Sequence, residues 1–184
     1  VAGPLIQDRM WVLLSYRRTS NSNLVANSFY RDGRPGVNNI SIKNYTGRLT
    51  MQVSKRNKLN LHLDRIMRDN PDFVAPGQIV EESSQTWDAM HGLYVIEQAR
   101  WTSTISNKLL FEVADSTLIF NWPNTRKPEA TGISILNRNT GFRYNAPLAS
   151  SLGQRVASQS NQRASASYIT GSHALKTGFQ SQQG

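Results

Sequence analysis

Apolar and polar residues alternate strictly along several segments of the chain, whereas helical periodicity is nearly absent. Every second residue of 48–54 is apolar, and the pattern resumes over 58–64 after three polar residues. Strict alternation is typical of β-strands with one apolar and one polar face. The pattern therefore predicts a β-hairpin in which Met51 lies opposite Leu61.

The same construction recurs twice farther along the chain. A second predicted hairpin sets Trp101 opposite Leu109. A third sets Tyr168 opposite Leu175 across a Gly-Ser loop, which is typical of a type II′ turn. One more alternating strand begins near Met10, and we expect its hairpin partner to lie before residue 1.

These segments predict an all-β fold, an antiparallel up-and-down meander of about seven strands. The predicted strands cover residues 9–20, 46–54, 58–67, 93–103, 108–121, 162–170 and 173–182. Turns of two to six residues alternate with long loops, which we expect at 21–45, 66–92 and 122–161. Every second connection of a meander lies at the same end, so the short turns share one end and the long loops the other.

This asymmetry indicates a transmembrane β-barrel. Long structureless loops are rare in compact soluble domains, whereas outer-membrane barrels combine strands of about ten alternating residues with short periplasmic turns and long extracellular loops. One face of the predicted strands carries Leu, Met, Val, Phe and Ala, as lipid contact requires. The other face suits a water-filled lumen and carries Arg48, Thr50, Gln52, Asn60, His62, Asp64, Ser165, Ser167 and Lys176.

Aromatic residues gather near both predicted ends of the strands. Trp11, Trp101 and Tyr168 lie near the short turns, and Tyr94 and Phe120 lie near the long loops. This placement resembles the two aromatic girdles of a membrane barrel. The alternative is that aromatic residues near strand ends only stabilise the hairpins.

The amino-acid composition excludes several kinds of site. The chain has 184 residues, no cysteine and a formal charge of +9. The absence of cysteine excludes disulfides, thiolate zinc sites and cysteine nucleophiles, and no catalytic or phosphate-binding motif is present. The three histidines are far apart in the sequence. We therefore expect no catalytic residue, no metal, no cofactor and no enzymatic activity.

The positive charge is compatible with an anionic partner, but its spacing along strands and loops does not form one patch, and no nucleic acid is expected. Aromatic residues and arginine dominate binding hot spots. The candidate ligand contacts in the predicted long loops are therefore Phe73, Trp87, Trp122 and Arg126.

Short stretches of the chain, taken in order, resemble TonB-dependent outer-membrane receptors of the type with an N-terminal carboxypeptidase-regulatory-like domain. The resembling stretches are Gly3-Pro4-Leu5, Asp8-Arg9-Met10-Trp11, Ser15-Tyr16-Arg17, Lys55-Arg56-Asn57-Lys58-Leu59, Trp101-Thr102-Ser103, Asn107-Lys108-Leu109-Leu110, 166–173 and Lys176-Thr177-Gly178-Phe179.

The resemblance implies a 22-stranded plugged barrel in the bacterial outer membrane that imports a bound ligand with energy from the TonB complex. This chain is then expected to be a fragment, about a third of the barrel, without the plug and regulatory domains. The implied partners are outer-membrane lipid, the plug domain, the TonB complex and an unknown ligand. The alternative is a soluble basic β-sheet module that binds nucleic acid or polysaccharide.

Overall fold

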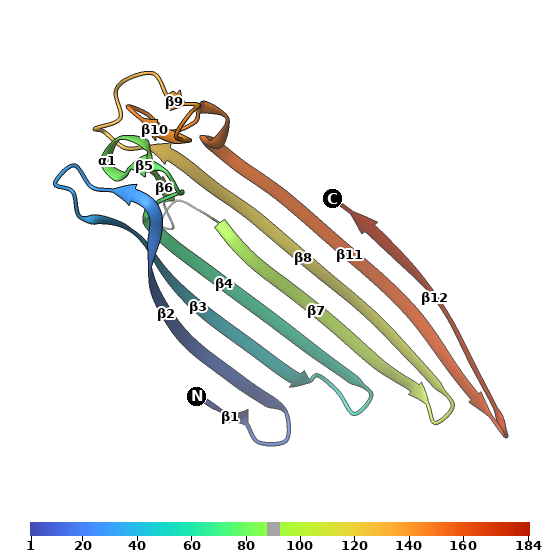
Figure 1. Cartoon of the computed structure of the whole chain (residues 1–184). Coiled ribbons are helices and arrows are strands. Elements are labelled where there is room, and N and C mark those ends of the chain that lie inside the picture. The colour runs from blue at the N-terminus through green and yellow to red at the C-terminus, as the bar shows by residue number, and fades with distance from the viewer. Residues whose placement is uncertain (88–92) are drawn as a thin grey trace.

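Seven long strands and five short ones form a single sheet in the computed structural model, which describes residues 1–87 and 93–184 (Figure 1). The long strands are β2 (Met10–Phe29), β3 (Pro35–Gln52), β4 (Asn57–Phe73), β7 (Leu93–Ser106), β8 (Leu109–Arg126), β11 (Gly153–Thr170) and β12 (His173–Gln183). The short strands are β1 (Ala2–Ile6), β5 (Gln78–Ile79), β6 (Gln85–Trp87), β9 (Ile135–Asn137) and β10 (Phe142–Tyr144). The helical segments are α1 (Val80–Ser83) and the 3-10 turn η1 (Ala149–Ser151).

Eight strands form an antiparallel meander in chain order, β1–β2–β3–β4–β7–β8–β11–β12. The predicted all-β meander is confirmed, but seven was too low a strand count. The five additional strands are only two to five residues long, too short to show a period in the sequence. The sheet is also mixed, because β5 pairs in parallel with β2 and β10.

The first hairpin is longer than predicted. β2 continues to Phe29 and β3 already begins at Pro35. Most of the predicted loop 21–45 is therefore paired strand, and only 30–34 is a turn. The prediction failed there because residues 19–23 of β2 are polar on both faces, so the alternation stops along that strand. Alternation marks a strand only where one of its faces is apolar.

The other two predicted long loops are also shorter and partly ordered. β4 continues to Phe73 and β8 continues to Arg126, while β11 already begins at Gly153. The described connections, residues 74–87 and 127–152, hold the small elements β5, α1, β6, β9, β10 and η1. They lie together at one end of the long strands (Figure 1), and we call them the cap.

The short turns all lie at the opposite end of the long strands, as predicted (Figure 1). The partner of β2 is β1, which pairs through Ala2 and Leu13, so the expectation of a partner before residue 1 was wrong. A strand of five residues beginning at Ala2 was overlooked because Gly3 and Pro4 indicate a turn.

One predicted register is correct and two are displaced. Tyr168 lies opposite Leu175 as predicted. Met51 instead faces Leu59, and Trp101 faces Val113, displacements of two and four residues. The turn between β3 and β4 spans residues 53–56, and a register shift lies between residues 104 and 106 of β7. Both displacements are even, so every side chain stays on its predicted face.

The sheet is a single layer without a hydrophobic core. Among the described residues, the buried hydrophobic ones are only Val74, Val80, Val95, Ala130 and Ala146, and all but Val95 belong to the cap. Large apolar side chains of the long strands remain open, such as Leu14 at 56% and Phe179 at 69% exposure. A sheet of this kind is stabilised by its backbone ladders and leaves both faces free for other partners.

Polar contacts hold the cap on the ends of the strands. The Ser28 hydroxyl donates to the Ala75 carbonyl at 2.7 Å. Glu82 accepts from the backbone N–H of Asn145 at 2.8 Å and from the Arg31 side chain at 3.2 Å. These contacts join both cap segments to the β2–β3 turn.

Candidate functional site

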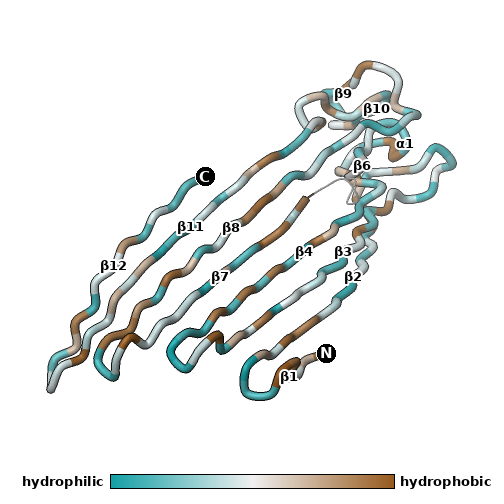
Figure 2. Tube along the Cα trace, turned by 180° about the vertical axis from the view of Figure 1, so that it is seen from behind, coloured by the Kyte–Doolittle hydropathy of each residue, from teal (hydrophilic) through white to brown (hydrophobic). Residues whose placement is uncertain are grey.

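The register gives the sheet one apolar and one polar face, because directly opposite residues of antiparallel strands point to the same side. Hydrophobic and hydrophilic residues alternate along β4 in the half near its short turn (Figure 2). We call the apolar positions in that half of the sheet the apolar band. They are Met10, Val12, Leu14, Tyr16, Tyr45, Gly47, Leu49, Met51, Leu59, Leu61, Leu63, Ala99, Trp101, Leu109, Phe111, Val113, Ala164, Ala166, Tyr168, Leu175, Thr177 and Phe179.

All nine side chains predicted to line a watery lumen lie on the opposite face, which we call the polar face. The predicted division into two faces is therefore confirmed. What the polar face encloses stays a prediction.

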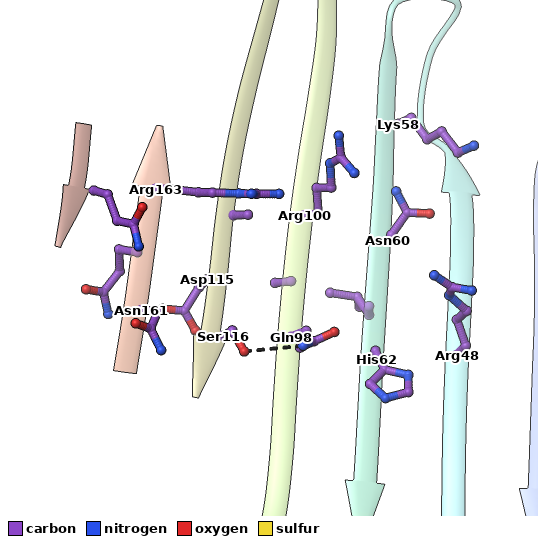
Figure 3. Close-up of a pocket in the computed structure, with 15 residues that line it drawn as sticks. Arg48, Lys58, Asn60, His62, Gln98, Arg100, Asp115, Ser116, Asn161 and Arg163 are labelled. Atoms are coloured by element: carbon purple, nitrogen blue, oxygen red, sulfur yellow. Dashed lines mark hydrogen bonds between the residues drawn. The ribbon is translucent and has the colours of Figure 1, made fainter. Parts of the chain in front are cut away.

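Polar side chains run across the polar face in rows. One row crosses five neighbouring strands through Arg48, His62, Gln98, Ser116 and Asn161. Gln98 Nε2 donates to Ser116 Oγ at 3.3 Å, the contact drawn in Figure 3. A hollow of about 620 Å³ lies over this row. The rows thus present amides, hydroxyls and cations to whatever occupies this side.

Positive charge exceeds negative charge on the polar face. Glu112 pairs with Arg100 and, at 3.7 Å, with Lys176. Arg48 and Lys58 are exposed and form no ion pair among the described residues. This face can therefore bind water and polar or anionic groups.

An aromatic cluster lies on the polar face closer to the cap. The Tyr94 ring meets the Phe120 and Trp122 rings edge-on, each at 5.7 Å between centroids, and Phe120 lies 4.8 Å from Trp122. The Arg68 guanidinium lies 5.3 Å from the centre of the Trp122 ring, a cation–π contact. Trp122, predicted as a loop residue, therefore lies within β8 and packs into this cluster.

The other candidate ligand contacts lie at the strand ends below the cap. Phe73 and Arg126 end β4 and β8, and both are paired with Gln85 of β6, which lies between them. Arg126 Nη1 donates to the Gly132 carbonyl at 3.2 Å. Trp87 ends β6. The structure thus gathers these candidates at one end of the sheet, and their role in ligand binding stays a prediction.

The five predicted interface aromatics divide between the two faces. Trp101 and Tyr168 lie in the apolar band, whereas Trp11, Tyr94 and Phe120 lie on the polar face. A single belt on the apolar face can include only the first two, because side chains alternate with period two.

An aromatic pair that was not predicted from the sequence lies at the upper rim of the band, the rim nearest the cap. Tyr16 and Tyr45 lie directly opposite each other, with ring centroids 5.1 Å apart. A correct β2–β3 register would have revealed the pair, but that hairpin was not predicted.

The described residues lack two further features. No group of three His, Asp or Glu side chains is placed to hold a metal ion. No helix in the described part of the chain has the length and apolarity to cross a membrane. His91, one of the three histidines weighed in the sequence, lies outside the described residues.

Comparison with known proteins found no match. No family model, no curated protein and no solved structure matches this chain. The functional argument therefore depends on the geometry described above.

Proposed function

We propose that this chain forms part of the wall of a TonB-dependent transporter in the bacterial outer membrane, without enzymatic activity. Its apolar band contacts lipid, its polar face lines the lumen beside the plug domain, and the cap contributes to ligand binding on the cell exterior. The observation that carries the proposal is the oblique course of the apolar band across the strands.

The course of the band gives a strand tilt. The band ends at Tyr16 on β2. The residue of β8 that lies at the same level as Tyr16, four strand spacings away across the sheet, is Ile119. On β8 the band ends six residues earlier, at Val113. Six residues span about 20 Å along a strand, and four spacings span about 19 Å across the sheet. If the band is level, the strands are tilted by about 45° from its normal.

This tilt is the geometry that a membrane barrel requires. Strands of outer-membrane barrels are tilted by about 35–45°, so an apolar band that is level in the membrane crosses such strands on a diagonal. The short turns in Figure 1 likewise lie along a line that the strands cross obliquely.

The apolar band is thinner than the apolar band of a typical membrane barrel, which sets a further requirement for the proposal. Residues 10–16 of β2 span about 24 Å along the strand, which is about 17 Å along the normal at a 45° tilt, against about 25 Å for a typical apolar band. The proposal therefore requires the rim on the side of the short turns to lie in the membrane too. Its apolar side chains include Val53 in the β3–β4 turn and Ile105 near the end of β7, which are 65% and 42% exposed.

The open apolar face argues against the soluble alternative. A basic β-sheet module in water would leave Leu14, Leu63, Phe111 and Phe179 exposed on one continuous surface. Soluble monomers rarely expose contiguous apolar patches of more than a few hundred Å².

Cysteine labelling in intact cells tests the proposal, since the chain has no cysteine of its own. One variant carries Asn139→Cys in the cap, and its matched control carries Arg56→Cys in a short turn. With a membrane-impermeant maleimide, we expect Asn139→Cys to be labelled in intact cells and Arg56→Cys only after the outer membrane is opened. Equal labelling of both sites in intact cells, or recovery of the protein in a soluble fraction, would refute the proposal.

A further inference from the structure

A shallow, largely apolar hollow crosses the apolar band from β2 to β8. Its volume is about 480 Å³. Gly47 belongs to its lining, lies between Leu14 and Leu63 in the register and has no side chain to fill the space there. The rest of its apolar lining is Val12, Leu49, Leu61 and Ala99. The hollow thus has the apolar lining that a hydrocarbon chain requires.

Two cations lie on the same face just beyond the upper rim of the band. Arg18 and Lys43 are directly opposite each other on β2 and β3, one step past the Tyr16–Tyr45 pair. Both side chains are exposed, and neither forms an ion pair or a side-chain hydrogen bond among the described residues. Like charges directly opposite each other destabilise a strand pair. An anion between them would remove this repulsion.

The acidic residues of this face lie to one side of the two cations. Glu97 and Asp115 border the hollow from β7 and β8. On β4, Asp69 lies opposite Ser41, one step past Lys43, and Asp72 lies opposite Asn39 and is paired with Lys127. The β2–β3 side is therefore where a negative headgroup is attracted, and the β7–β8 side is where it is repelled.

We propose that the hollow and the Arg18–Lys43 pair form one binding site for a phosphate-bearing lipid. An acyl chain lies in the hollow at Gly47, and the phosphate is bound by the two cations about 13 Å farther along the strand. The Tyr16–Tyr45 pair lies between the two parts, at the level where amphipathic rings lie in a membrane. The inference rests on the proposed function, because it requires the apolar face to contact lipid.

The test uses the full protein, purified in detergent and titrated with phosphatidylglycerol, with bound lipid counted by native mass spectrometry. The test variant is Arg18→Gln with Lys43→Gln. The control, Lys58→Gln with Arg163→Gln, removes the same charge from the polar face, at residues that do not line the hollow. Each basic residue near an anionic lipid surface contributes a factor of about five, so we expect about 30-fold weaker binding in the test variant and less than a twofold change in the control.

A second pair of variants tests the hollow. Gly47→Leu fills it, whereas Gly47→Ala leaves most of it open, since a Cβ there meets Leu14 Cδ2 at an ordinary 3.8 Å. We expect weaker lipid binding only for Gly47→Leu. Equal effects of both charge variants, no effect of either, or displacement of the lipid by an equimolar amount of inorganic phosphate would overturn the inference.

The labelling experiment separates the two possible failures. If Asn139→Cys is labelled from outside while Arg18→Gln with Lys43→Gln binds lipid normally, the lipid site is wrong and the proposed function stands. If Asn139→Cys is not accessible from outside, the proposed function is wrong, and the lipid site that rests on it is wrong too.

Discussion

A charged side chain introduced into the apolar band should lower the free energy of unfolding, and by more the closer the side chain lies to the middle of the band. Leu49 lies in the middle of the band on β3, between Val12 and Leu61. An arginine on the lipid-facing side of a barrel strand costs about 2–4 kcal/mol at the bilayer midplane and about 0–1 kcal/mol near the interface. We therefore expect Leu49→Arg to lower the unfolding free energy by about 2–4 kcal/mol, a factor of about 30 to about 900 in the unfolding equilibrium.

Two arginine variants on the same strand serve as controls. Thr50 is the next residue and points to the polar face, where its hydroxyl donates to Asn60 Oδ1 at 3.1 Å, so Thr50→Arg should cost only about 0.5–1.5 kcal/mol for the lost hydrogen bond. Ser41 shares the face of Leu49 but lies past the band and opposite Asp69, so Ser41→Arg should cost at most about 1 kcal/mol.

The assay is urea unfolding of the full protein in lipid vesicles, followed by tryptophan fluorescence. The expected order of cost is Leu49→Arg first, then Thr50→Arg and Ser41→Arg. Equal costs for Leu49→Arg and Thr50→Arg would refute the assignment of the two faces, and a cost for Ser41→Arg as large as that for Leu49→Arg would refute the position of the band.

Three further predictions follow from particular contacts. A Cβ at Gly178 would meet the Ala164 carbonyl oxygen at 2.7 Å, so Gly178→Ala should destabilise the β11–β12 hairpin by about 1–3 kcal/mol in the same unfolding assay. Asp72 pairs with Lys127 at the base of the cap, with side chains 20% and 13% exposed, so Asp72→Asn should speed proteolytic cleavage within 127–152, as measured by mass spectrometry, without changing the meander. The backbone N–H of Arg34, and next the Arg34 side chain, donate hydrogen bonds that hold the pKa of Asp32 below its ordinary 3.8. Because this pKa is depressed, we expect the 30–34 turn to be fully ordered above pH 3.8 and to lose its order as the pH falls through the lower pKa. NMR of Asp32→Asn should show that this order is lost at all pH values.

The faces of the sheet could be predicted from the sequence because side chains alternate with period two wherever one side is apolar. The register of the third hairpin was predicted to the residue, because Gly171 and Ser172 leave room for only one tight turn. The start of its first strand was not, since β11 begins at Gly153. For the first two hairpins the faces were predicted correctly and the register was not. Turns that differ in length by an even number of residues fit the same alternation, so the alternation does not distinguish between them.

The upper halves of the strands and the cap could not be predicted. Residues 19–23 of β2 are polar on both faces, so no alternation distinguishes them from a loop. The cap depends on contacts between distant segments, such as Ser28 with Ala75 and Glu82 with Asn145. The hollow at Gly47 required the register of three strands, since it exists only because Leu14 and Leu63 lie on either side of that glycine.

Site-directed spin labelling of β3 in lipid vesicles tests whether the apolar band faces lipid and the polar face does not. Single nitroxides are placed in the full protein at successive positions from Tyr45 to Gln52, and collision with membrane-dissolved oxygen is compared with collision with a water-soluble nickel complex. The account predicts a period of two, with oxygen favoured at Gly47, Leu49 and Met51 and nickel favoured at Arg48 and Thr50. Equal access of the nickel complex to both sets of positions would contradict it.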